Sequence, residues 1–422
     1  MTQNTKNSPV SLSMMMFLQY AVWGVWLPYL ANYLTGTVAD GGLNFTGAQV
    51  GWILGLAGSI GAVTAPFLAG QIADRFIDAS KYLGILLILG GIAKFATFYA
   101  TSYNSFLILS IVFSVMYMPT LALTNSIAFA HLKNPEGSFP RVRVWGTIGW
   151  IVASTAFPLV WLQTDISMTW VPWFFEGTPK EGGVGLIATC LQVSGVISIL
   201  YGIWAILLLP STPPTRNVEH PLAFLGAFKK FMRPDLAVLA LAALLISMVH
   251  QIYFIRTGPF LEDIGFPLAN IGGMMAIGQI FEIGILAILG LMIARLGFKW
   301  TIAVGCLAYV LRWVMFALAD NSAEDLVYVG IALHGFCYAC FFAASFIYVE
   351  RVATSDIRHS MQTVFGIIIL GVGPIIAGFY NGSLDGVDGW ANIWWIQAGV
   401  TAVPLLLIIL LFNSQSSSLE HD

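Results

Sequence analysis

The sequence predicts an all-α membrane protein with twelve transmembrane helices in two six-helix halves and with both termini in the cytoplasm. Its composition, the lengths of its apolar segments and the distribution of its basic residues predict this fold class. Of the 422 residues, 58% are hydrophobic and 9% are charged, and the mean hydropathy is +0.82. Soluble domains carry about 25% charged residues, so a soluble fold of this length could not hide so much apolar surface.

The individual spans follow from the length of each apolar run. A helix needs about 20 apolar residues to cross a bilayer. Twelve segments qualify, at approximately 14–34, 48–72, 82–100, 106–130, 144–161, 185–209, 236–255, 271–294, 300–319, 327–349, 361–379 and 391–412. These runs are too long for membrane strands and lack alternation with a period of two, so the spanning elements are predicted to be helices.

The orientation follows from Lys and Arg, which are concentrated in cytoplasmic segments of membrane proteins. With the N-terminus inside, the cytoplasmic segments hold 14 of the 18 basic residues, and the outside loops hold only Lys180. Lys94, Arg256 and Arg312 fall in or near spans. We interpret Lys94 and Arg312 as structural, because long basic side chains can snorkel or bind backbone carbonyls.

Charge and cysteine content exclude several other classes. The net charge of −3 gives no reason to expect a nucleic-acid partner. All four cysteines lie in apolar runs, so we expect no disulfide framework. Cys337 and Cys340 form a CxxC pattern on a membrane helix, which we interpret as small residues packing between helices. We expect no metal and no cofactor. The absence of HExxH and GxSxG motifs disfavours a membrane-embedded enzyme.

An internal repeat divides the chain. The long polar segment 211–235 separates an N-terminal half, 1–210, from a C-terminal half, 236–422. After the second span the chain reads "GQIADRFIDASK" (70–81), and after the eighth it reads "GLMIARLGFK" (290–299). Two six-helix halves related by a repeat are typical of alternating-access transporters. We expect these loops to brace the cytoplasmic gate through Gly70, Asp74, Arg75, Lys81, Arg295 and Lys299.

Polar side chains inside spans are the candidates for substrate contact, because they are costly in a membrane. Glu282, in "GQIFEIGIL", is the one carboxylate in the predicted membrane interior. Gln279 lies three residues before it on the same helical face. In the fifth span, Arg143, Thr147 and Trp150 also share a face. The remaining candidates are Gln19, Asn125, His250, Gln251 and Tyr338. Asn125 and Thr147 could equally be hydrogen-bonding glue between helices, and Arg143 could be a cytoplasmic positive anchor.

The chemistry of these residues favours a neutral ligand. They offer amides, hydroxyls and aromatic planes, with one acid and one or two bases. A polyanion would require more Lys or Arg, and a cation would require more carboxylates. A nucleoside fits, because its base can stack on aromatic rings and its ribose hydroxyls can bond to amides. A sugar fits nearly as well.

Several stretches resemble the nucleoside:proton symporter family, the bacterial nucleoside permeases of the major facilitator superfamily. They are "FLQYAVWGVWL", "MPTLALTNSI", "RVRVWGTIGW", "GQIFE" and "LRWVMFAL". The resemblance implies proton-driven uptake of nucleosides through a bacterial inner (plasma) membrane. It matches family ligand positions to Arg143, Thr147, Trp150, Gln251, Gln279, Glu282 and Tyr338. Trp150 stands where the family has Phe. We expect a monomer whose partners are the neutral solute, protons and the lipid bilayer.

Two positions depart from the family pattern. Phe254 stands where a related permease has an Asn that contacts ligand. Ala339 stands where it has an Asp implicated in coupling. With no acid at position 339, Glu282 is predicted to be the main proton carrier. Burial raises the pKa of a carboxyl group and a nearby cation lowers it, so a carboxyl under both influences can bind and release a proton. The alternatives are a saccharide or polyol as the solute, or facilitated diffusion without protons.

Overall fold

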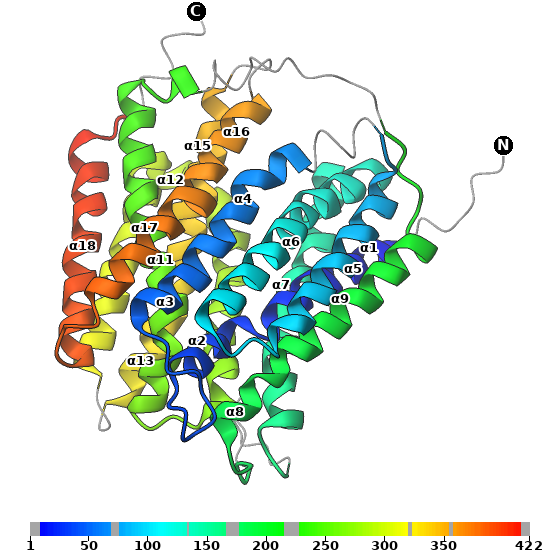
Figure 1. Ribbon diagram of the computed structural model, residues 1–422. Coiled ribbons are helices and arrows are strands. Elements are labelled where there is room, and N and C mark those ends of the chain that lie inside the picture. Colours follow the sequence, from blue (N-terminus) through cyan, green and yellow to red (C-terminus); the bar gives the residue numbers. More distant parts are fainter. Residues whose placement is uncertain are drawn as a thin grey trace, which may run out of the picture. The chain divides into compact units, whose positions relative to one another are not determined.

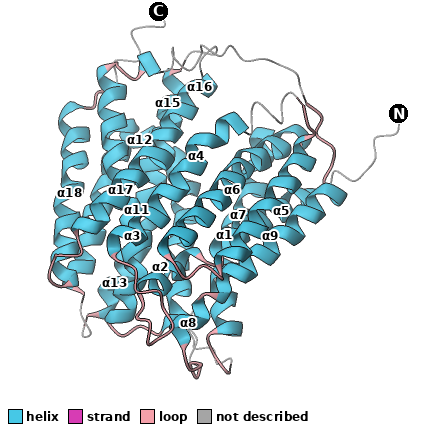
Figure 2. Ribbon diagram, viewed as in Figure 1, coloured by secondary structure: helices cyan, strands magenta, loops and turns pink. Residues whose placement is uncertain are grey.

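The computed structural model describes residues 9–68, 76–132, 135–165, 177–214, 228–319, 323–353 and 358–414. Within these ranges nearly all regular structure is helical, as Figure 2 shows, apart from one isolated bridge between Gln163 and Pro179. Eleven helical stretches are long and apolar enough to cross a membrane. One of them, Leu268–Leu318, is 51 residues long and contains two of the predicted spans. The expectation of twelve spans is therefore confirmed.

The long helix α12 (Ile271–Leu318) changes direction at Gly297, which has φ 73° and ψ 170°. Glycine adopts this positive φ without steric cost, whereas a side chain would make it strained. Gly297 lies in the loop that the sequence predicts between the eighth and ninth spans. Two spans thus follow one another with a single non-helical residue between them.

The chain divides into two compact units. Unit 1 comprises Met1–Val218, Phe254–Glu262 and Phe266–Gly273, and unit 2 comprises Glu219–Tyr253, Asp263–Gly265 and Met274–Asp422. The main division falls inside the predicted polar segment 211–235. The two short stretches assigned to unit 1 flank the loop after the seventh span. Asn32 Nδ2 donates to Glu262 Oε2 at 2.5 Å within this unit. The domain boundaries given by the sequence stay a prediction.

Unit 1 contains the first six spans (Figure 1). Its helices are α1 (Pro9–Gly24), α2 (Leu27–Thr35), α3 (Gly47–Gly51), the π-helical η1 (Trp52–Leu56), α4 (Ala57–Leu68), α5 (Ala79–Thr97), α6 (Tyr103–His131), α7 (Pro135–Trp161), α8 (Gly183–Ile187) and α9 (Thr189–Leu208). Helices α5 and α9 lie side by side at two glycine pairs, Gly84 with Gly202 and Gly91 with Gly195. A Cβ on Gly91 would lie 2.8 Å from the Gly195 carbonyl oxygen. Small residues allow such close backbone contact in membranes.

Unit 2 contains most of the remaining spans. Its helices are α11 (Pro234–Asp263, up to Tyr253), α12 from Met274, α13 (Glu324–Ala332), α14 (His334–Phe336), the π-helical η4 (Cys337–Ala343), α15 (Ala344–Val352), α16 (Arg358–Gly366), the π-helical η5 (Ile367–Val372), α17 (Gly373–Ser383) and α18 (Trp390–Leu411). The short 3-10 helix η3 (Leu268–Asn270) precedes α12 and belongs to unit 1. The tenth and eleventh spans thus each contain π-helical turns, which in proteins are frequent at functional sites.

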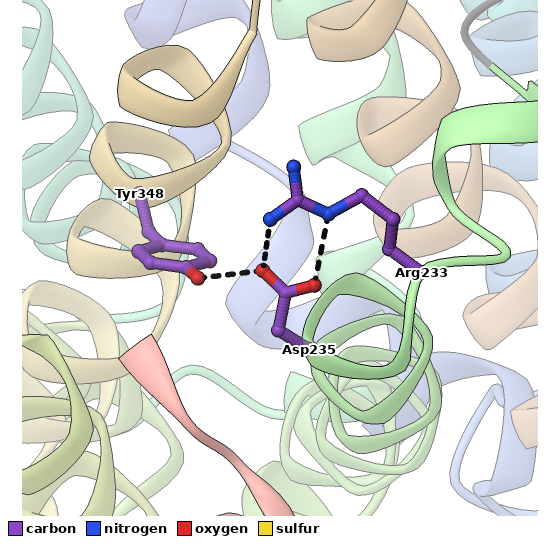
Figure 3. Close-up of polar contacts among 3 residues, drawn as sticks. All are labelled: Arg233, Asp235 and Tyr348. Carbon is purple, nitrogen blue, oxygen red and sulfur yellow. Dashed lines mark hydrogen bonds and ion pairs between the residues drawn. The ribbon is translucent and has the colours of Figure 1, made fainter. Parts of the chain in front are cut away.

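A partly buried ion pair at the start of α11 is hydrogen-bonded to a tyrosine of α15 within unit 2. Arg233 donates from Nε and Nη2 to the two carboxylate oxygens of Asp235, at 3.2 and 3.1 Å. Tyr348 OH donates to Asp235 Oδ2 at 2.7 Å, as Figure 3 shows. Asp235 is 4% exposed and lies in the first turn of α11, where a negative charge is favourable. The carboxylate is thus held by a bidentate arginine, a tyrosine and the helix end.

Lys94 and Arg312, which occupy matching places in the third and ninth spans, both lie over aromatic rings. Lys94 Nζ is 3.3 Å from the centre of the Trp26 ring in unit 1. The Arg312 guanidinium carbon is 4.5 Å from the centre of the Tyr253 ring in unit 2, and Arg312 Nε donates to the Gly330 carbonyl at 3.2 Å. Both cations are buried and stabilised by cation–π contacts. This agrees with their structural interpretation.

Candidate functional site

In unit 1, the candidate residues of the fifth span lie where α7 crosses α1. The crossing is close because Gly24 faces the Trp150 backbone, and Gly149 faces the backbone of Phe17. A Cβ on Gly24 would lie 2.6 Å from the Trp150 carbonyl oxygen. Trp150 is 6% exposed, whereas Trp145 on the same helix is 44% exposed. The fold therefore turns Trp150 inward among the helices of unit 1.

Arg143 lies one turn of α7 before Thr147, and both are half-buried. The Arg143 guanidinium carbon is 4.2 Å from the centre of the Tyr20 ring on α1. A cation stacked on a ring keeps its planar fork of donors oriented. Arg143, Thr147 and Trp150 thus follow one another along α7, as their spacing predicts.

Gln19 and Asn125 lie on α1 and α6 of the same unit. Gln19 is fully buried and donates from Nε2 to Thr120 Oγ1 at 2.7 Å, while its backbone carbonyl accepts from Tyr117 OH. Within the described residues, Gln19 Oε1 has no hydrogen-bond partner. Asn125 is half-buried one turn beyond Leu121 on α6. The Gln19 amide therefore links α1 to α6 through its nitrogen, and its Oε1 atom can still accept a hydrogen bond.

In unit 2, the eighth and tenth spans cross at two glycines. A Cβ on Gly335 would lie 2.7 Å from the Glu282 backbone nitrogen, and one on Gly278 would lie 2.8 Å from the His334 side chain. The absence of side chains at both positions lets α14 lie directly against α12. This contact places His334 beside the polar pair Gln279 and Glu282.

The polar pair of the eighth span makes contacts with that histidine. Gln279 Nε2 is 3.2 Å from His334 Nε2, and Glu282 Oε2 is 3.9 Å from the same ring nitrogen. Glu282 is 8% exposed and His334 is 2% exposed. A carboxylate, an amide and an imidazole thus meet inside a predicted membrane span, where such groups are expensive.

Aromatic side chains of the seventh, ninth and tenth spans form a chain of contacts that begins at His334. The His250 ring lies 5.5 Å from that of His334, and His250 Nδ1 is 2.7 Å from Tyr309 OH. Tyr338 is half-buried in η4, and its ring is 5.9 Å from that of Phe342. The Phe342 ring in turn lies 5.1 Å from that of His250.

The other predicted positions differ in how exposed their side chains are. Gln251 and Phe254 are half-buried on α11, and Ala339 is fully buried in η4. Lys81 and Arg295 are exposed, and Lys299 is half-buried. Gly70, Asp74 and Arg75 of the predicted gating loop lie outside the described residues. No group of three metal-ligating side chains occurs among the described residues, and the four cysteines are free and buried.

Sequence reasoning missed His334. A signal was present, since the residue lies in the middle of an apolar run and four residues before Tyr338, on the same helical face. Reading every polar residue of a span as a candidate would have included it. Its contact with Glu282 could not be read from the sequence, because it depends on how the eighth and tenth spans cross.

The twelve spans and the match to a solved transporter of the same fold define a multi-pass membrane protein of the major facilitator fold, and the family to which the chain belongs consists of transporters and not of enzymes. The chain belongs to the nucleoside H+ symporter family, whose sequence pattern matches residues 6–417. The resemblance noted from the sequence is thereby confirmed, as are nucleoside transport and coupling to protons as the family function.

Individual relatives agree with this placement. The chain is 29% identical to the xanthosine permease of Escherichia coli strain K12, over 97% of both chains. It is 26% identical to the nucleoside permease NupG of the same organism, over 96% of both chains. A crystal structure of a variant of the nucleoside transporter NupG matches with a TM-score of 0.84 at 25% identity. That match covers 96% of this chain and all of the other.

Proposed function

We propose that this protein carries nucleosides inward across a bacterial inner (plasma) membrane together with protons, and that Glu282 takes part in both steps. The observation that carries the proposal is the burial of this carboxylate, 8% exposed, inside the eighth span of a nucleoside H+ symporter. A carboxyl group there can accept from a ligand hydroxyl when ionised and donate to it when protonated.

The ligand contacts in this proposal are the polar and aromatic side chains that the sequence predicts inside the spans. They are Gln19, Asn125, Arg143, Thr147, Trp150, Gln251, Gln279, Glu282 and Tyr338. Trp150 and Tyr338 supply faces for the base, since every base has a π-face that stacks on aromatic rings. The amides, the Thr147 hydroxyl and the Arg143 fork supply the hydrogen bonds for base edges and ribose hydroxyls.

The proton is assigned to Glu282 because the tenth span offers no acid at position 339. Ala339 is fully buried and cannot titrate. A buried carboxyl that faces changing surroundings can bind and release a proton during a transport cycle, as intramembrane acids do in pumps and transporters. The protein would work as a monomer, with the loops 70–81 and 290–299 bracing the cytoplasmic side.

Competition for uptake tests the choice of solute. Cells or proteoliposomes containing the protein are given a labelled nucleoside together with an excess of unlabelled nucleosides, sugars or polyols. Nucleosides should block the labelled uptake, whereas sugars and polyols should leave it unchanged. If a saccharide inhibits the uptake and no nucleoside does, the transported solute is a sugar and the proposed nucleoside is wrong.

The oligomeric state is tested separately. Light scattering on the purified protein in detergent should give the protein mass of one 45.8 kDa chain after subtraction of the detergent. A protein mass twice as large, retained on dilution, would show that the monomer assignment is wrong.

A further inference from the structure

One imidazole nitrogen faces both polar side chains of the eighth span. His334 Nε2 lies 3.2 Å from Gln279 Nε2 and 3.9 Å from Glu282 Oε2. The His334 side chain lies against Gly278 at the helix crossing, and its ring lies 5.5 Å from that of His250 and 5.4 Å from that of Tyr253. The imidazole is thus fixed against Glu282 by packing.

The Gln279 contact determines which ring nitrogen carries the hydrogen. An amide nitrogen can only donate, so Gln279 Nε2 donates and His334 Nε2 accepts. In this arrangement Nε2 carries no hydrogen, and its one lone pair accepts from Gln279, so a proton can bind there only when the Gln279 amide turns away.

We propose that His334 is the proton-exchange partner of Glu282, so that the cotransported proton is shared between this carboxyl and this imidazole. The inference rests on the proposed function, in which Glu282 binds the proton. In the exchange, the O–H bond of the Glu282 carboxyl breaks, its electron pair stays on the carboxylate, and an N–H bond forms at His334 Nε2. The pair keeps one proton and a net charge of zero throughout.

The surrounding groups make the two residues depend on one another. The titratable and charged groups that contact or act on His334 are Glu282 on the eighth span, His250 and Tyr253 on the seventh, and Arg312 on the ninth. The Arg312 cation lies over the Tyr253 ring and opposes a second positive charge nearby. An imidazolium at His334 therefore needs the Glu282 carboxylate beside it.

The shared proton also changes what Gln279 offers to a ligand. Once His334 Nε2 is protonated it can no longer accept from the amide nitrogen, so Gln279 has to turn its Oε1 toward the ring. After the turn, the Gln279 Nε2 donor faces away from His334, where the Oε1 acceptor was before. A ligand on that side then meets a hydrogen-bond donor in place of an acceptor. Ligand affinity and proton occupancy are then linked, and each must alter the other by the same factor.

The test compares His334→Gln with the control His131→Gln in unit 1. His131 ends α6, and its Nε2 lies 3.0 Å from Thr212 Oγ1. For the wild type, we expect nucleoside affinity in detergent to vary with pH, because ligand affinity and proton occupancy are linked. In His334→Gln this pH profile should flatten, and accumulation driven by a pH gradient should fall at least about tenfold. Exchange of labelled for unlabelled nucleoside should persist, and His131→Gln should keep both the profile and the accumulation.

The outcomes separate this proposal from the proposed function. If the wild type neither binds nor exchanges nucleosides, the proposed function is wrong. If the wild type concentrates nucleosides and His334→Gln does so equally, with an unchanged pH profile, the role of His334 alone is wrong. A purely structural role would reduce exchange and accumulation by the same factor and leave the shape of the pH profile intact, which also overturns the proposal.

A measurement on the wild type covers the case in which the variant does not fold. Infrared difference spectra of nucleoside binding are recorded with and without ¹⁵N-labelled histidine rings. A carboxyl band and a label-sensitive imidazole band should change together. A change in the carboxyl band with no change in any imidazole band would contradict a shared proton.

Discussion

Trp150 gives the sharpest prediction at the scale of single residues. Base–aromatic stacking contributes about 1–3 kcal/mol, so Trp150→Ala should weaken nucleoside binding about tenfold or more. Trp150→Phe should keep most of the affinity because it retains an aromatic face. Trp145→Ala is the matched control, since Trp145 lies on the same helix and is 44% exposed. Calorimetric titration of the detergent-purified proteins measures the effect, and equal affinity in Trp150→Ala and the wild type would remove Trp150 from the site.

Arg143 can be tested against its neighbour Arg141, which is exposed at the same end of α7. Arg143→Ala should weaken binding because the guanidinium held over Tyr20 supplies a fork of donors, which a Lys ammonium cannot reproduce. Arg143→Lys should therefore recover only part of the affinity. Arg141→Ala should bind as the wild type does. The assignment fails if Arg143→Ala binds nucleoside normally in detergent, where no membrane orientation is at stake.

Single residues also show what the sequence could predict about the site. Glu282 and Gln279 were identifiable because polar groups stand out in an apolar run. The spacing of Arg143, Thr147 and Trp150 predicted that they share one helical face. The partners of Gln19 and Glu282 were not predictable, because Thr120 and His334 come from other spans and their proximity depends on helix crossings.

Among the elements, the crossing of α14 and α12 is the one on which the polar cluster of unit 2 depends. A Cβ added at Gly335 would lie 2.6 Å from the Phe281 backbone carbonyl carbon, so the helices have to separate. Gly335→Ala should cost about 1–3 kcal/mol of stability, as overpacking does. It should also lower nucleoside uptake by moving His334 away from Glu282.

The control for this crossing is Gly284→Ala on α12, the helix against which Gly335 packs, where nothing lies within 4 Å of an added Cβ. It should retain the melting temperature and the uptake of the wild type. Both variants are compared by thermal denaturation in detergent and by uptake of labelled nucleoside. A Gly335→Ala protein as stable and active as Gly284→Ala would show that the two helices do not approach closely.

The elements show where the sequence was informative about the fold. All twelve spans were predictable, because each contains a run of about 20 apolar residues. The single-residue turn at Gly297 and the π-helical turns η4 and η5 were not. A π-turn adds one residue to a helical turn without changing composition, so the pattern of residues carries no signal for it.

At the scale of the whole molecule, we propose that the protein is a nucleoside:proton symporter in which the Glu282 carboxyl links the two fluxes. Glu282→Gln mimics the protonated carboxyl and keeps its shape. An exchange of labelled for unlabelled nucleoside needs no net proton movement, so the variant should still exchange, at reduced affinity. Concentrating nucleoside against its gradient needs the proton, so that activity should be lost.

The most direct test is the accumulation of labelled nucleoside in proteoliposomes under an imposed pH gradient, acidic outside, for the wild type and Glu282→Gln. We expect the wild type to concentrate nucleoside until a protonophore collapses the gradient, and we expect Glu282→Gln to exchange nucleoside without concentrating it. Wild-type uptake that does not respond to the gradient would make the protein a facilitator. Gradient-driven accumulation by Glu282→Gln would show that the proton is carried elsewhere.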